Sequence, residues 1–276
     1  MILPGSYANG FAPRDGQPLY PELWKGCVGA WAPCLGPTGL TLRDWSGFAQ
    51  HGTLTNMDVG TDWVVDRGRY ALDFDGTNDF VTASPSAVNI QQTDAFSGSA
   101  WIKLTGSGIN STAGRAIVNT WYQQSGWRFI VTDWPGTQGR IDFGALDGSG
   151  YGRLATGSTR VDDGLLHHVA FTYSGNSDAS GIKLYVDGKP ETTTIRNNAS
   201  PGTLNNAGLA IGRLVELFYY FPGLISDVQL WRRELAESEV RLLSRRIGIA
   251  YELAPRRRSS SAVQFNRRRR LLLGAS

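Results

Sequence analysis

The chain has 276 residues, 34 of them glycine and nine tryptophan, and a formal net charge of +3. This length suits one large domain, and the many glycine-containing turns favour an all-β domain over two domains. No run of about 18 apolar residues indicates a membrane helix, and no repeat of about 20 to 50 residues indicates a solenoid or propeller. The N-terminus lacks the basic and apolar regions of a signal peptide, so we expect a product assembled in the cytoplasm.

The charge is unevenly distributed along the chain. Residues 232–276 contain twelve arginines and four glutamates, a balance of +8, so the first 231 residues carry −5 to reach the total of +3. From Leu253 onward there are seven arginines and no acid. A mildly acidic body is therefore followed by a strongly basic segment.

Residues 1–25 are rich in Pro, Gly and Tyr without periodicity, which predicts an arm. Predicted strands follow at 27–32, 70–75, 79–83, 99–104, 115–121, 127–132, 139–145, 151–156, 167–173, 182–186, 209–213 and 223–231. About a dozen strands at this spacing indicate a sandwich or jelly roll. The one predicted helix covers residues 235–246, with apolar residues near helical spacing and glutamates early.

The segment from His167 to Pro190 has the clearest strand pattern. Apolar and polar residues alternate with period two, which places Val169, Phe171 and Tyr173 on one face. A Gly/Asn/Ser/Asp cluster then turns the chain, so that residues 182–186 pair back on this strand. Asp187-Gly188 predicts a second tight turn.

These residues also carry a family resemblance. HHVAFTYSG followed by IKLYVDGKP resembles the central hairpin of the laminin G-like, concanavalin A-like jelly-roll family, and GLISDVQLWRRELAESEV resembles its closing strand and short helix. Upstream, the segments GAW (29–31), DWSG (44–47), HGTL (51–54) and ALDFDGTNDFV (71–81) resemble its first strands and loops. The resemblance covers about residues 26–246. It implies an all-β, concanavalin A-like jelly-roll β-sandwich at 26–248, a fold that hosts unrelated activities. Composition and charge predict the arms at 1–25 and 249–276 on either side of it.

Catalysis has little support in the sequence. Glucanases of this fold resemble one another in a Glu-x-Asp-x-Glu strand that places two carboxylates on one face. This chain has only Glu22 before Glu191, so no such strand exists. His167 and His168 are adjacent and face opposite sides of a strand, and no Gly-x-Ser-x-Gly accompanies them. We therefore predict a protein that is not an enzyme.

The resemblance implies calcium wherever the family binds a metal, because oxygen-rich loops suit a hard cation. Asp44 and Ser46 occupy the matching loop, and Asp227 follows in the later motif. Residues 46–50 read Ser-Gly-Phe-Ala-Gln where the family often has Ser-Gly-Asn-Gly-Asn, and Ser226 replaces an acid. Two interpretations stay open: a weakened calcium site, and an Asp44 that caps a turn. We expect that the protein requires no cofactor and that calcium binding is the one possibility left open.

The only two cysteines are Cys27 and Cys34. Without an export signal we expect them to be reduced rather than bridged. No Cys-x-x-Cys motif accompanies them, so they predict no metal site.

Glycan binding requires aromatic side chains beside polar donors and acceptors. Trp121, Tyr122 and Trp134 are the candidate glycan-binding residues, with neighbouring glutamines and an aspartate. Alternation places Trp127 on a buried face with Phe129, so burial in the core competes with sugar stacking for each tryptophan. Trp134 precedes Pro-Gly in a predicted turn, where we expect exposure.

The basic C-terminal segment has three interpretations: a solvated end, a nucleic-acid contact, or a docking element for an acidic protein. Arginine is used throughout, which suits bidentate pairing and favours a protein partner, either further copies of the chain or a capsid protein. The predicted assembly contacts are Arg256, Arg257, Arg258, Phe265, Arg267, Arg268, Arg269 and Arg270. The leading hypothesis is a non-catalytic virion component anchored by its arms, and the alternative is a module that binds cell-surface glycans.

Overall fold

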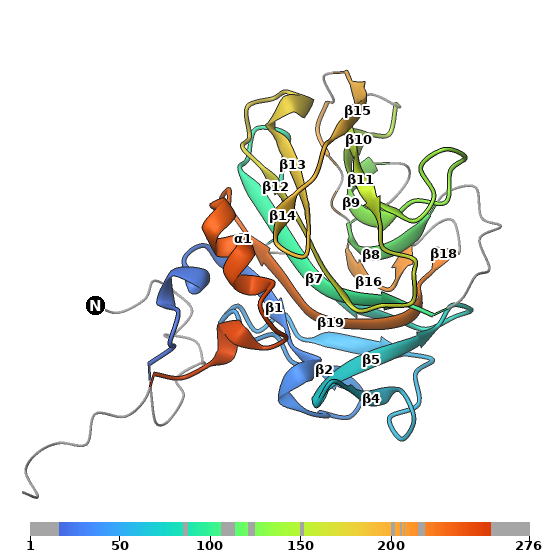
Figure 1. Cartoon of the computed structure of the whole chain (residues 1–276), viewed down its shortest axis with the longest axis vertical. Coiled ribbons are helices and arrows are strands. Elements are labelled where there is room, and N and C mark those ends of the chain that lie inside the picture. The colour runs from blue at the N-terminus through green and yellow to red at the C-terminus, as the bar shows by residue number, and fades with distance from the viewer. Residues whose placement is uncertain are drawn as a thin grey trace, which may run out of the picture.

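A computed structural model of the chain describes residues 17–84, 88–105, 114–120, 125–149, 152–199, 202–204, 206, 208–214 and 219–254. Two large antiparallel sheets pack face to face, and one short α-helix lies on the outer side of one of them (Figure 1). The predicted all-β sandwich with a short C-terminal helix is confirmed. None of the helices in these residues is long and apolar enough to span a membrane.

The first sheet has eight strands. Seven lie in the order β14 (Lys189–Pro190), β13 (Ile182–Val186), β12 (His167–Tyr173), β7 (Phe96–Leu104), β19 (Pro222–Trp231), β5 (Arg69–Asp75) and β4 (Trp63–Asp66), and β1 (Cys27–Trp31) also pairs with β19. The predicted hairpin is confirmed, since Val169 pairs with Val186 and Tyr173 with Ile182. Asp187 and Gly188 both have positive φ, as the tight turn into β14 requires.

The second sheet has nine strands. Their order is β15 (Thr194–Asn198), β11 (Gly152–Arg160), β10 (Arg140–Asp147), β9 (Ser125–Val131), β8 (Arg115–Asn119), β16 (Leu209–Ile211), β6 (Phe80–Ala83), β3 (Gly52–Thr55) and β2 (Thr41–Leu42). A separate two-stranded sheet joins β17 (Arg213–Leu214) and β18 (Tyr219–Tyr220). Loops of this second sheet, together with its outer face, form the site described below.

The main core lies between the two sheets and is centred on Phe171. Its ring stacks on Phe143 at a centroid distance of 4.0 Å and meets Phe129 edge-on at 5.0 Å. Gly98 makes room for this ring, because a Cβ built there would lie 2.5 Å from Phe171 Cε1. The predicted burial of Val169, Phe171 and Tyr173 on one face is confirmed.

A second core covers the outer face of the eight-stranded sheet. It is formed by α1 (Glu237–Leu243), the 3-10 helices η1 (Pro21–Trp24) and η4 (Ile249–Tyr251), and side chains such as Trp24, Trp231 and Tyr251. Two further 3-10 helices, η2 (Pro33–Leu35) and η3 (Ala179–Gly181), lie in loops. The predicted arm boundaries need correction for this reason. Residues 17–25 and 249–254 belong to the folded unit, since Leu19 N donates to Glu252 O and Ala254 N donates to Gln17 O.

Most of the predicted strands are present, with ends shifted by a few residues. The helix is shorter than predicted, because Arg245 N donates to Leu242 O, a tighter bond that ends the helical pattern. The short strands β2, β3, β4 and β15 were not predicted. Each is at most five residues long and partly exposed, so its apolar residues are too few to produce a clear pattern.

Candidate functional site

The outer face of the nine-stranded sheet carries a polar cluster in an otherwise apolar region. Along β9 and β10, core residues such as Phe129 and Phe143 alternate with outward residues that include Arg128 and Asp142. In the neighbouring strand β11, Ala155 faces the core, so Thr156 faces outward beside Asp142, with which it pairs. The period-two geometry therefore places a guanidinium, a carboxylate and a hydroxyl on one face.

Asp142 is at the centre of this cluster and has no solvent exposure. Its Oδ2 accepts a hydrogen bond of 2.6 Å from Thr156 Oγ1 and lies 4.0 Å from Arg196 Nη1, which comes from β15. Its Oδ1 has no hydrogen-bond partner among the described residues. Burial raises the pKa of this carboxyl group, and the nearby positive charge of Arg128 opposes that rise.

Trp134 lies in the turn that follows β9 and is half-buried against an apolar cluster that contains Ile130 and Leu146. The Arg196 guanidinium lies over the indole, with Cζ 4.1 Å from the ring centroid, and Arg128 Cζ lies 5.2 Å from it. The predicted turn is present, but the ring is more enclosed than its place beside Pro-Gly indicates. We refer to Trp134, Arg128, Asp142, Thr156 and Arg196 as the Trp134 site.

The Trp134 site combines the three kinds of contact that a sugar ring uses. The indole offers an apolar face to C–H groups, and guanidinium N–H groups donate hydrogen bonds to hydroxyl oxygens. The unpaired Oδ1 of Asp142 accepts one from a hydroxyl proton. About one third of the Arg196 side chain is exposed, so this guanidinium also contacts solvent.

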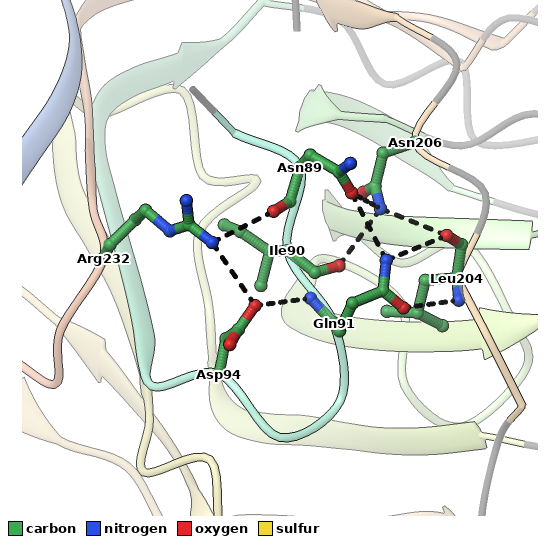
Figure 2. A network of polar contacts seen from close by, with 7 residues as sticks. All are labelled: Asn89, Ile90, Gln91, Asp94, Leu204, Asn206 and Arg232. Atoms are coloured by element: carbon green, nitrogen blue, oxygen red, sulfur yellow. Dashed lines mark hydrogen bonds and ion pairs between the residues drawn. The ribbon is translucent and has the colours of Figure 1, made fainter. Parts of the chain in front are cut away.

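A network of amide side chains fixes the loops near the end of β8. Gln91 Oε1 accepts from Leu204 N at 2.9 Å, and Gln91 Nε2 donates to Leu204 O at 3.1 Å; Figure 2 shows both contacts. Asn206 Nδ2 donates to Ile90 O at 3.1 Å, and Asn206 Oδ1 accepts from Thr120 Oγ1 at 2.8 Å. These side chains satisfy one another, so the network serves to hold the loops rather than to present free donors.

The sequence matches a family of known proteins, Laminin_G_3, described as the concanavalin A-like lectin/glucanases superfamily, over residues 75–241. The match covers more than half of the chain and includes strands of both sheets. The chain belongs to this superfamily. No curated protein matches the sequence.

Solved structures similar to this concanavalin A-like domain include the binding domain of Paraclostridial Mosquitocidal Protein 1, with 17% identity and a TM-score of 0.63 over 80% of this chain and 52% of that chain. The binding domain of botulinum neurotoxin serotype D has 15% identity and a TM-score of 0.58 over 79% and 51%. The serotype D ligand binding domain in complex with N-acetylneuraminic acid has 16% identity and a TM-score of 0.57 over 79% and 50%. The chain spans about half the length of these structures, and the likeness at these identities is one of fold.

Of the three predicted glycan-binding residues of the concanavalin A-like domain, the structure describes Trp134. Trp121 and Tyr122 lie outside the described residues. Trp127 is in the main core, where it meets Phe96 edge-on at 4.8 Å, as the alternation predicts. Sequence reasoning did not identify Arg128, Asp142, Thr156 and Arg196, although an aspartate inside the apolar strand at 139–145 was a visible signal.

The loop residue predicted for calcium organises a turn in the concanavalin A-like domain. Asp44 Oδ1 accepts from Ala30 N and Ser46 N, and Oδ2 accepts from Gln50 N, each at 2.9 Å. Ser46 Oγ also donates to Oδ2 at 2.8 Å. Four donors therefore contact this carboxylate, as the turn-capping interpretation requires, and calcium binding at this loop stays a prediction.

Asp227, the third predicted calcium ligand, holds a different segment. It is buried in β19, and its Oδ2 accepts from Gly248 N at 2.5 Å. Burial raises the pKa of this carboxyl group. Within the described residues no three His, Cys, Asp or Glu side chains are grouped as a metal site requires. Cys27 and Cys34 are separate, buried thiols.

The adjacent histidines face opposite sides, as predicted. His167 lies between Asp187 at 2.9 Å and Asp163 at 3.0 Å, and the hydrogen bond to Asp187 raises its pKa. His168 is fully enclosed beside Trp101, and burial lowers its pKa to about 4.

The predicted assembly contacts, Arg256 to Arg258, Phe265 and Arg267 to Arg270, lie outside the described residues.

Proposed function

We propose that this protein is a non-catalytic carbohydrate-binding module, and that the Trp134 site is where it contacts sugar. The observation that carries the proposal is the pairing of an aromatic ring with a buried, half-satisfied carboxylate. Asp142 Oδ1 lacks a partner, and Arg196 lies between that carboxylate and the Trp134 ring. A buried acceptor without a partner costs about 1–3 kcal/mol, so a hydroxyl that donates to it gains that amount.

Binding requires Arg196 to move away from the indole ring. Its side chain is partly exposed and its nearest Asp142 oxygen is 4.0 Å away, beyond hydrogen-bond distance. The stacking energy of an exposed guanidinium on an indole is roughly 0.5–1 kcal/mol, which a sugar ring on the same face replaces. Arg196 then donates to the sugar from the side.

The fold supports the proposal in a general way. The similar structures are titled as binding domains, and one of them is a complex with N-acetylneuraminic acid. Since the identity is 16% and about half of that protein lies outside the match, its ligand is not transferred to particular residues here. We propose for this protein the same class of ligand, a glycan.

The absence of catalysis belongs to the same proposal. Glycoside hydrolysis by two carboxylates requires both on one face. Strands β8 to β11 contain two acidic residues, Asp142 and Asp147. They are five residues apart in β10, so strand alternation places them on opposite faces. We expect no release of reducing sugar from any glycan that the protein binds.

A glycan array probed with the full chain tests the proposal. We expect selective binding to at least one glycan class, and Trp134→Ala to weaken it about tenfold, which corresponds to about 1.4 kcal/mol. Phe48→Ala is the matched control, because Phe48 is a 48% exposed aromatic residue in a loop outside the site. An array without hits, or equal binding by Trp134→Ala and wild type, contradicts the proposal.

Anchoring in a virion through the basic segment is a separate proposal that rests on the sequence of residues 255–276. The structure determines how to test it. Ile249 and Tyr251 are in the second core, so the truncated chain must end at Ala254 rather than before η4. We expect light scattering to show a large species for the full chain and a monomer after truncation. Equal masses contradict the anchoring role without affecting glycan binding.

A further inference from the structure

A cavity of about 300 Å³ lies on the outer side of the eight-stranded sheet, on the other sheet from the Trp134 site. Four arginines line it: Arg67 and Arg69 from the β4–β5 hairpin, and Arg245 and Arg246 from the segment after α1. The remaining lining is apolar and comes from Trp101, Leu166 and Ile247. One cavity thus combines a cationic rim with an apolar wall.

Among the described residues, the four arginines of this cavity outnumber the acids beside them. Arg246 pairs with Glu252. Arg67, Arg69 and Arg245 have no ion pair with any residue that the structure describes. Asp66 pairs with Lys103 at 3.1 Å, and the buried Asp227, which accepts from Gly248 N, is the described carboxyl group that the charge of Arg69 influences.

Such an arrangement costs free energy in the absence of a ligand. Like charges around a concave surface repel one another, and low-dielectric walls strengthen the field that they produce. An anion inside the cavity removes this repulsion. Arginine is also the side chain best suited to the bidentate recognition of carboxylate, sulfate and phosphate groups.

Backbone geometry holds the arginines in place. Arg67 and Gly68 both have positive φ, at 48° and 77°, and Asp66 pairs with Arg69 across them, which makes the hairpin turn tight. On the other side, Ile247 is buried next to Gly248, whose φ of 79° turns the chain after Arg246. The two pairs of arginines are therefore presented from two fixed turns.

The apolar wall is equally well defined. Trp101 is 9% exposed and meets the buried His168 ring edge-on at 5.3 Å. Because burial lowers the pKa of His168 to about 4, this ring is neutral at pH 7 and does not add to the positive charge. The wall presents indole and aliphatic carbon to whatever the arginines bind.

We propose that this cavity binds a small organic oxyanion, with its carboxylate, sulfate or phosphate group on the arginines and its carbon skeleton against Trp101. The volume of about 300 Å³ lies at the lower end of the range for small-molecule sites and suits a ligand of monosaccharide size. An inorganic ion alone leaves the apolar wall uncovered. The proposal does not depend on glycan binding at the Trp134 site.

Calorimetric titration of the full chain tests this proposal with five probes. N-acetylneuraminic acid and glucose 6-phosphate carry an oxyanion on a sugar ring, and benzoate carries one on an aromatic ring. Two controls complete the set: glucose lacks the negative charge, and sodium sulfate lacks the carbon skeleton. We expect at least one organic anion to bind at least tenfold more tightly than both controls, and the preferred anion identifies a sugar acid, a phosphate ester or another organic acid.

Two single variants and a matched control locate the site. Arg69→Gln and Arg245→Gln should each weaken binding of the preferred anion at least tenfold and change the melting temperature little, because neither arginine forms an ion pair with a described residue. Arg241→Gln changes the same charge on α1, where Arg241 is 65% exposed and pairs with Glu237, and should leave binding unchanged. Glucose binding as tightly as the anions, the absence of binding by every anion, or equal losses in all three variants overturns the proposal. None of these outcomes bears on glycan binding at Trp134, which the glycan array tests separately.

Discussion

Replacing Asp44 with alanine tests whether this carboxylate organises the loop by hydrogen bonding. The substitution removes the acceptor of three main-chain N–H groups, on Ala30, Ser46 and Gln50, all of which belong to buried residues. Each buried donor without a partner costs about 1–3 kcal/mol, and water entering the vacated volume recovers part of that cost. We expect the free energy of unfolding to fall by about 4 kcal/mol.

Thermal and urea denaturation of purified protein measure this change. For a chain of this size, 1 kcal/mol corresponds to about 2–4 °C, so the melting temperature should fall by about 8–16 °C. Asp75→Ala is the matched control, because Asp75 Oδ1 also accepts from three main-chain N–H groups, on residues 77 to 79. Thr77 and Asn78 are exposed there, so water replaces the carboxylate and the loss should be about 1 kcal/mol.

Comparing Asp44→Ala with Asp75→Ala shows whether burial of the N–H donors sets the cost of removing the carboxylate. Losses that agree within about 1 kcal/mol refute the argument that burial of the donors sets the cost. Calcium supplies a second readout on the same proteins. If Asp44 is a calcium ligand, millimolar calcium stabilises the wild type and not Asp44→Ala, whereas saturation of its lone pairs by hydrogen bonds predicts no calcium-dependent difference between them.

Three further outcomes follow from the described contacts. The pKa of His167 is raised in the folded protein, so the stability that its protonated form contributes is complete below the usual pKa of 6.5. That stability is lost as the pH rises through the raised pKa. Urea titrations from pH 6 to pH 9 should show this loss in the wild type but not in His167→Gln. Gly98→Ala should destabilise the protein by about 1–3 kcal/mol in the same titration, because a Cβ meets the Phe171 ring at 2.5 Å, and a neutral effect contradicts this packing. Burial raises the pKa of the Cys27 and Cys34 thiols, so a thiol reagent at pH 8 should modify them only after unfolding, and rapid labelling of native protein contradicts their burial.

Local sequence patterns determined the strands and the faces that they bury. The alternation from His167 to Tyr173 and the turn residues Asp187 and Gly188 specify a hairpin whatever surrounds it, because side-chain direction in a strand has period two. The same rule placed Trp127 in the core. The short edge strands escaped prediction because an exposed strand has no apolar face to produce a pattern.

Tertiary structure alone decided which polar residues meet. Trp134 comes from a turn, Asp142 from β10 and Arg196 from β15. Strand β11 lies between β10 and β15, and its pairing with β15 contains a register shift that no local sequence pattern encodes. Arg69 and Arg245 lie far apart in the sequence and share a cavity only because the segment after α1 folds back across the eight-stranded sheet. The physical reason is the separation of the residues along the chain. Strand alternation depends on neighbouring residues, whereas strand register and the path of the segment after α1 depend on how the whole core packs.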